Sequence, residues 1–237
     1  MKETIDILAF GAHADDVEIG MGGTIARMSE QGLKVVICDL TQAELSSNGT
    51  VEIRKQEASK AADVLGVHER IHLHLPDRGL VLKAEYIAEI ASVIRTYQPR
   101  IIFAPYFEDR HPDHGNCAKL VEEAMFSAGV KNYIDYKKQK AHRAESLYFY
   151  MINGFHKPDF IVDVSSAFQK KVASLEAYES QFIKTADTFD TPLVNGYIET
   201  VESRERLFGK EVGVAYGEGF LSKKPILMYD DLVGENK

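Results

Sequence analysis

Short apolar runs rich in β-branched residues alternate with amphipathic stretches through the first half of the chain. This alternation is typical of β-α-β units, in which right-handed connections join parallel strands through helices. Strands are expected at 5–10, 35–40, 71–75 and 100–105, and helices at about 22–31, 51–65, 84–97 and 117–128. The pattern therefore predicts an α/β fold of the Rossmann-like type, with a mostly parallel sheet and helices on both faces.

The second half of the chain is less regular. Strands are expected at 146–151 and 160–164 and a helix near Ser166, but few elements can be placed from about Lys184 onwards. No linker rich in Pro, Gly or Ser divides the chain, and a length of 237 residues suits one α/β core. We therefore expect a single domain over residues 1–237, with a less regular C-terminal part.

Composition limits the partners of the chain. Its 28 Lys and Arg against 36 Asp and Glu give a net charge of −8, whereas nucleic-acid binding depends on clustered cations. Two widely separated cysteines, Cys38 and Cys117, indicate a reducing compartment. The first residues lack a signal-peptide pattern, and no apolar run is long enough to span a membrane. We expect a cytoplasmic protein that binds neither nucleic acid nor a membrane.

Two loops that follow expected strands carry imidazoles and carboxylates. Residues 12–18 read Ala-His-Ala-Asp-Asp-Val-Glu, and residues 109–115 read Asp-Arg-His-Pro-Asp-His-Gly. Open α/β sheets bind ligands at the carboxyl ends of their strands. A hydrolytic zinc site needs three ligands from His, Asp or Glu, an open position for water, and a nearby base that does not bind the metal. The loops together predict a hydrolytic metal site, although their spacing does not decide which Asp is a ligand.

Each loop also has a simpler interpretation. An Asp of residues 12–18 could cap a helix, and residues 111–114 could form a turn. Gly20, Gly22 and Gly23 resemble a dinucleotide loop only weakly, because their spacing is not G-x-G-x-x-G and an acidic loop before them would repel a pyrophosphate. The coincidence of both loops at strand ends favours the metal site over these alternatives.

The two loop motifs together resemble the signature of the PIG-L/LmbE family of zinc-dependent N-deacetylases, which remove acetyl groups from N-acetylglucosamine-type amino sugars. Many members have Pro at the position of Ala14, which permits the loop but does not fix φ. Further segments resemble the subgroup of bacillithiol biosynthesis: residues 45–50, Arg54 with Glu57, residues 76–79 and residues 150–156. The resemblance implies hydrolysis of N-acetylglucosaminyl malate to glucosaminyl malate and acetate.

Residue roles follow from the same resemblance. It implies that His13, Asp16 and His114 bind Zn²⁺, while His and Asp ligands also accept Fe²⁺ or Co²⁺. It also implies that Asp15 is the general base that takes a proton from the attacking water. The resemblance further implies that His111 is the cation or the acid that lies beside the tetrahedral intermediate. Either Asp15 or His111 could protonate the leaving amine.

The remaining site predictions concern residues around the metal motif. Asp113 is expected to hold an imidazole, and Arg54 to bind substrate oxygen atoms. Arg110 and Arg78 suit the carboxylates of malate, or brace their loops through salt bridges. Two further residues could have either a role in the site or a purely structural role. They are Tyr197, whose hydroxyl could reach the oxyanion or the sugar, and His156.

Three functions remain in competition. The first is the deacetylase of N-acetylglucosaminyl malate, and the second is a deacetylase or amidase of another N-acetylglucosamine derivative or of a thiol S-conjugate. The third is a metal- or sugar-binding protein without activity, which the non-ligand carboxylate Asp15 argues against. The resemblance implies a small-molecule amino-sugar partner and a homo-oligomer, such as a hexamer built from trimers. Phe189, Phe208 and Phe220 belong either to subunit contacts or to the core.

Overall fold

The computed structural model describes residues 5–227 and has a seven-stranded sheet in the order β3-β2-β1-β4-β5-β7-β6. The strands are β1 (Ile7–Gly11), β2 (Val35–Asp39), β3 (Glu69–His72), β4 (Ile101–Pro105), β5 (Ser146–Tyr150), β6 (Phe160–Asp163) and β7 (Gly217–Leu221). The helices are α1 (Asp16–Glu30), α2 (Val51–Leu65), α3 (Ala84–Tyr97), α4 (Pro112–Ala128), α5 (Phe168–Glu176), α6 (Glu179–Phe182) and α7 (Tyr197–Val212), with a 3₁₀ helix η1 (Pro192–Val194).

The sheet is mostly parallel, as expected for a Rossmann-like α/β fold. Strands β1 to β5 pair in parallel, and Ile7 of β1 lies opposite Val35 of β2 and Ile101 of β4. Among the strands of residues 5–227, only β7 runs antiparallel to its neighbours, β5 and β6. The predicted fold class is therefore confirmed, with one antiparallel strand that the sequence did not indicate.

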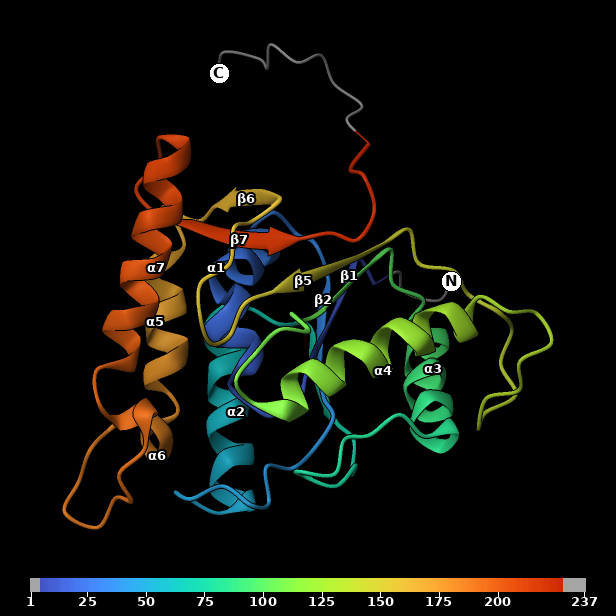
Figure 1. Ribbon diagram of the computed structural model, residues 1–237, viewed down its shortest axis with the longest axis horizontal. Helices are drawn as coiled ribbons and strands as arrows, with labels where there is room; N and C mark the ends of the chain where they lie inside the picture. The colour runs from blue at the N-terminus through green and yellow to red at the C-terminus, as the bar shows by residue number, and fades with distance from the viewer. Residues whose placement is uncertain (1–4, 228–237) are drawn as a thin grey trace.

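Helices cover both faces of the sheet. Figure 1 shows α3 and α4 on one side and α1, α2 and α5 on the other. All five residues of β1 are buried, and they alternate between the two layers. Leu8 and Phe10 pack toward α3 and α4, whereas Ile7 and Ala9 pack toward the opposite helices. Burial on both faces explains why this strand appears in the sequence as a continuous apolar run.

The order of the strands creates a crevice for ligands at the carboxyl ends of β1 and β4. The chain leaves β1 toward β2 and β3 and then crosses to β4 on the other side of β1. The loops after these two strands therefore diverge, and in open α/β sheets ligands bind in the crevice outside the carboxyl ends at such a point. The motifs at residues 12–18 and 109–115 begin in these two loops and continue into the first turns of α1 and α4.

Local capping chemistry fixes several helix limits. The Thr50 side chain accepts a hydrogen bond from the Ile53 N–H at 3.2 Å, and Gly66 ends α2 with a φ of 70°. Both positions match the usual helix signals, so α2 has the predicted bounds. Helix α4 begins earlier than predicted, because Pro112 occupies its first turn and His111 caps it.

Helix α1 is longer than predicted because it consists of two segments joined at a kink. Met21 has non-helical φ and ψ of −149° and 21°. The carboxylate of Glu218, on β7, accepts hydrogen bonds from the N–H groups of Gly23 at 2.9 Å and Thr24 at 2.6 Å. A distant residue thus caps the second segment, which corresponds to the predicted helix, and local sequence patterns do not show this contact.

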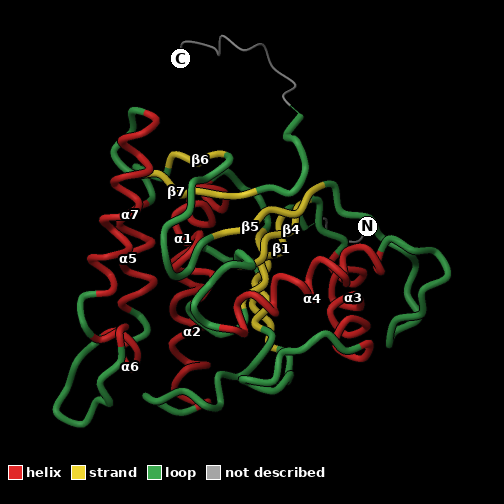
Figure 2. The backbone as a smooth tube through the Cα atoms, in the orientation of Figure 1, coloured by secondary structure: helices red, strands yellow, loops and turns green. Residues whose placement is uncertain are grey.

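The C-terminal part holds three elements that were not predicted, η1, α7 and β7. Figure 2 shows the long connection between α6 and α7 extending from the helix layer before the chain returns to the sheet. Phe208 and Phe220 are buried, whereas Phe189 is exposed. The first two aromatic side chains therefore belong to the core. Over residues 5–227, no helix combines the length and apolar character needed to cross a membrane.

Candidate active site

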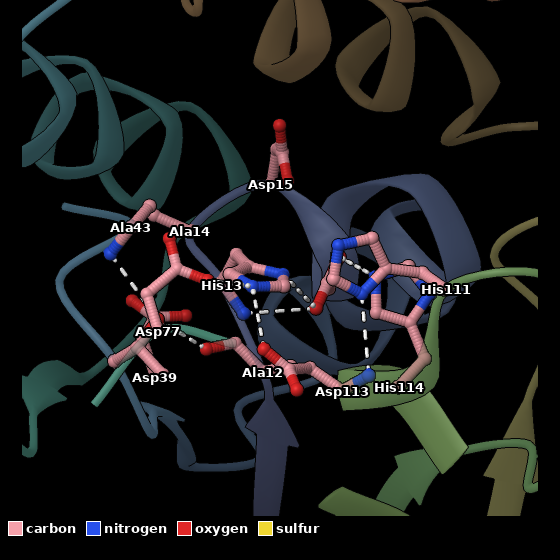
Figure 3. A network of polar contacts seen from close by, with 12 residues as sticks. Ala12, His13, Ala14, Asp15, Asp39, Ala43, Asp77, His111, Asp113 and His114 are labelled. Atoms are coloured by element: carbon pink, nitrogen blue, oxygen red, sulfur yellow. Dashed lines mark hydrogen bonds and ion pairs between the residues drawn. The ribbon is translucent and has the colours of Figure 1, made fainter. Parts of the chain in front are cut away.

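The loops after β1 and β4 bring the three predicted metal ligands together. Asp16 Oδ2 lies 3.6 Å from His13 Nδ1, and Asp16 Oδ1 lies 3.1 Å from His114 Nε2. One nitrogen of each imidazole therefore faces the same carboxylate. All three residues line one cavity of about 230 Å³. Figure 3 shows His13, from the loop after β1, and His114, from the first turn of α4, directed toward each other.

Carboxylates hold the opposite nitrogens of both imidazoles. His13 Nε2 lies 3.1 Å from Asp77 Oδ1 and 3.8 Å from Asp113 Oδ2. His114 Nδ1 lies 3.0 Å from Asp109 Oδ1. Metal-ligating histidines usually direct their second nitrogen to a carboxylate, which fixes the ring. The donor set therefore fits a divalent cation bound through His13 Nδ1, His114 Nε2 and the Asp16 carboxylate.

His111 offers an alternative third donor. Its ring nitrogen lies with those of His13 and His114 in a group whose possible ligand atoms are all within 4.8 Å, and Asp16 is not part of that group. His111 Nδ1 accepts a hydrogen bond from the Asp113 N–H at 3.3 Å. This contact places the proton of the neutral ring on Nε2. Both donor sets share His13 and His114, so the assignment of Asp16 as the third ligand stays a prediction.

Mutual contacts set the charge of these groups. Burial lowers the pKa of His114, but Asp16 and Asp109 outweigh it and raise the pKa to about 9. Burial raises the pKa of Asp16, yet His114 and His13 hold it well below its usual value. Burial also lowers the pKa of His111, and the neighbouring His114 and His13 lower it further, which favours a neutral ring over the expected cation. A metal that replaces the imidazole protons would release them on binding.

Asp15 points in a different direction from Asp16. Its backbone is left-handed, with a φ of 108°, a conformation that costs a non-glycine residue about 1–3 kcal/mol. Figure 3 shows its carboxylate directed away from the three imidazoles, although it lines the same cavity. Burial raises the pKa of Asp15 to about 7, against the opposing effect of Arg54. A carboxylate with such a pKa suits proton transfer near neutral pH.

Two guanidinium nitrogens of Arg54 contact protein groups, whereas its buried Nε has no hydrogen-bond partner among the described residues. The guanidinium Nη2 lies 3.1 Å from Asp15 Oδ2 and also donates to the Ala14 carbonyl. The Nη1 atom donates to Ser46 Oγ at 3.2 Å. Arg54 is only 4% exposed, although it lies on the cavity wall. The structure therefore places it as the partner of Asp15, while direct substrate binding stays a prediction.

Some of the other predicted site residues line the cavity and others do not. Arg110 and Tyr197 line the cavity, and the Tyr197 hydroxyl contacts Asn153 Oδ1 at 3.0 Å. The Arg78 N–H donates to Asp113 at 2.6 Å, so this residue braces its loop as well as lining the cavity. His156 does not line it; its Nε2 lies 3.1 Å from the Glu108 carbonyl oxygen.

Sequence reasoning did not single out two carboxylates that contact the imidazoles of the candidate site. Asp77 follows β3 and contacts His13, and Asp109 follows β4 and contacts His114. Their place in loops after strands was the available signal.

Comparison with known proteins agrees with this geometry. The family model described as PIG-L, GlcNAc-PI de-N-acetylase, matches residues 8–125. Diacetylchitobiose deacetylase of Thermococcus kodakarensis is 31% identical over 233 residues, covering 90% of this chain and 81% of the relative. A probable N-acetyl-alpha-D-glucosaminyl L-malate deacetylase 2 of Bacillus cereus is 24% identical, covering 74% and 83%.

A solved structure extends the comparison to the whole fold. The conserved protein TT1542 from Thermus thermophilus superposes with a TM-score of 0.87 at 35% identity, covering 95% of this chain and 97% of that chain. The family match spans both loops that carry the metal motif and the diacetylchitobiose relative covers most of the chain, so this protein belongs to the PIG-L family of hydrolytic deacetylases.

Proposed function

We propose that the protein is a zinc-dependent N-deacetylase that hydrolyses the acetamide of an N-acetylglucosamine derivative to acetate and a free amine. The observation that carries this proposal is the separation of two adjacent carboxylates. Asp16 contacts the imidazoles of His13 and His114, while Asp15 is held apart by Arg54 in the same cavity. Simple metal binding would not require the second carboxylate, which supports an enzyme over a binding protein.

The chain supplies the proton transfers of the reaction. His13, Asp16 and His114 would hold a divalent cation, which would supply Lewis acidity toward water and toward the acyl oxygen. Asp15 accepts a proton from the attacking water, whose oxygen forms a bond to the acetyl carbon. The C–N bond then breaks, and a proton from Asp15 or His111 passes to the leaving amine. The Nε2–H of neutral His111 suits hydrogen bonding to the acyl oxygen.

The relatives favour a broader substrate class than the malate conjugate. The 31% identical relative is named for diacetylchitobiose, whereas the relative named for glucosaminyl malate is 24% identical over less of this chain. These matches support deacetylation of an N-acetylglucosamine derivative. They favour an N-acetylated disaccharide over the malate conjugate as the substrate. The homo-oligomer, the cytoplasmic location and the identity of zinc as the native ion stay predictions.

Acetate release tests the proposal directly. Zinc-loaded protein should release acetate from diacetylchitobiose faster than from N-acetylglucosaminyl malate, and chelation should stop the reaction without unfolding the chain. Reloading with Zn²⁺, Fe²⁺ or Co²⁺ in separate samples then identifies the metals that support activity. A preference for the malate conjugate would restore the narrower substrate, and no acetate from any N-acetylglucosamine derivative would contradict the proposal.

A further inference from the structure

A second pocket opens beside the reaction cavity and shares a wall with it. It has a volume of about 660 Å³, compared with about 230 Å³ for the cavity that holds the imidazoles. The shared wall consists of Arg110, Ile152, Asn153 and Tyr197. Ligand pockets usually measure about 300–1,000 Å³, so the smaller cavity suits only part of a substrate. The two spaces together fit a ligand larger than one acetylated group.

One face of α7 and the loop after β5 form the rest of this second pocket. Helix α7 contributes Thr200, Ser203, Arg204 and Leu207, which follow the spacing of one helical face. The loop contributes Phe155, whose ring stacks on the buried Phe208 at a centroid distance of 5.0 Å and an interplanar angle of 20°. The pocket therefore has a supported aromatic ring on one wall and hydroxyl groups on the other.

Two of its apolar side chains are exposed. Phe155 is 55% exposed and Leu207 is 49% exposed, although both line a concave surface. Large apolar side chains left open in a pocket indicate a ligand that covers them. Because the second pocket lies beside the reaction cavity, we expect it to bind a part of the substrate that is distant from the acetyl group.

The charge of the pocket argues for a neutral occupant. Arg204 lines it, but its guanidinium donates to the carbonyls of Ile152 at 2.9 Å and Ile19 at 3.0 Å, and contacts Glu205 at 3.0 Å. Its positive charge is therefore already matched by a carboxylate. Arg110, at the shared wall, is the remaining cation of the lining. A dicarboxylate bound in this pocket would need more than one cationic side chain as a partner.

We propose that this second pocket binds the uncharged sugar ring attached to the N-acetylglucosamine unit that is deacetylated. The apolar face of that ring packs on Phe155 and Leu207, and its hydroxyls reach Thr200, Ser203 or Arg110. The proposal rests on the proposed deacetylase function and assigns Phe155 and Leu207 to substrate specificity. It makes the enzyme selective for a disaccharide over a monosaccharide.

The test compares kcat/KM for diacetylchitobiose and for N-acetylglucosamine in zinc-loaded protein. Phe155→Ala should lower the value for the disaccharide roughly tenfold and leave the monosaccharide value within about twofold. Leu207→Ala, which leaves the stacked pair of Phe155 and Phe208 intact, should act in the same direction. Phe126→Ala is the matched control, since Phe126 is a 76% exposed aromatic residue on α4 that lines neither pocket.

The outcomes separate this proposal from the function on which it rests. Equal losses on both substrates in both variants would make the pocket structural and overturn the proposal, as would unchanged kinetics on both. Wild-type protein that deacetylates the monosaccharide as well as the disaccharide would also overturn it while leaving the deacetylase function intact. Wild-type protein inactive on every N-acetylglucosamine derivative would overturn the function itself.

Discussion

Arg54 Nη2 lies 3.1 Å from Asp15 Oδ2, and both side chains are almost completely buried. The contact joins the start of α2 to the loop after β1. It explains how two adjacent acidic residues serve different purposes, because the left-handed backbone at Asp15 turns its carboxylate toward Arg54 while Asp16 faces His13 and His114. Residue 54 therefore acts on the proposed base rather than only on a substrate.

Asp15→Asn should abolish most turnover while the metal stays bound. Asparagine keeps the shape of the side chain and tolerates a positive φ, but it cannot accept a proton as a carboxylate does. A positioned general base contributes about 10²- to 10⁴-fold to rate, so kcat should fall by at least about 100-fold. Metal content per chain, measured by elemental analysis, should match that of the wild type. Turnover near the wild-type rate would remove Asp15 from the role of base.

Arg54→Gln should reduce kcat more than it raises KM. Hydrogen bonds to charged groups are worth about 1.5–3 kcal/mol, so loss of the contact to Asp15 should lower kcat roughly 10- to 100-fold. Arg54→Lys should recover part of the loss, because a cation remains beside the carboxylate. Steady-state kinetics at a temperature where all variants are folded measures both constants. A rise in KM with unchanged kcat would instead assign Arg54 to substrate binding.

The sequence indicated the two motif loops but not how their side chains are supported. His13, Asp16 and His114 stand in local motifs next to predicted strands, and parallel pairing of β1 with β4 brings these loops together. The carboxylate Asp77 contacts His13 across 64 positions of the chain, and only the register of the folded sheet brings them together. Strand β7 escaped prediction because its sequence, Gly-Glu-Gly-Phe-Leu, has two glycines, which are depleted in strands.

Asp109→Asn should weaken metal binding without removing a ligand. Asp109 Oδ1 lies 3.0 Å from His114 Nδ1, and it also accepts a hydrogen bond from the Asn153 side chain at 3.0 Å. Loss of such a partner typically lowers metal affinity about 10- to 100-fold, because the imidazole becomes less basic and less well oriented. Competition with a chromogenic zinc chelator measures the affinity. Glu108→Gln, which alters the exposed neighbouring carboxylate, should leave it unchanged.

The buried pair of Arg95 and Asp135 gives a prediction about stability. Arg95 Nη1 lies 2.9 Å from Asp135 Oδ1, and both side chains are fully buried. Burial alone would raise the pKa of Asp135, but hydrogen bonds from Gln139 and Arg95 outweigh it and hold the pKa below 3.8. Asp135→Asn leaves a buried guanidinium without its counter-charge, so the free energy of unfolding at pH 7 should fall by about 3 kcal/mol. Urea denaturation measures this loss.

The same pair makes the loss dependent on pH. A carboxyl whose pKa is lower in the folded chain stabilises it above the unfolded pKa of 3.8, and the stabilisation is lost as pH falls toward the folded pKa. The difference between wild type and Asp135→Asn should therefore be constant from pH 7 to 5 and shrink by about 1 kcal/mol on going from pH 5 to 3. Glu145→Gln, at an exposed pair with Arg100, should change stability by less than about 0.5 kcal/mol. A difference for Asp135→Asn that does not vary with pH would assign its effect to packing, because only the ionised carboxylate links stability to proton binding.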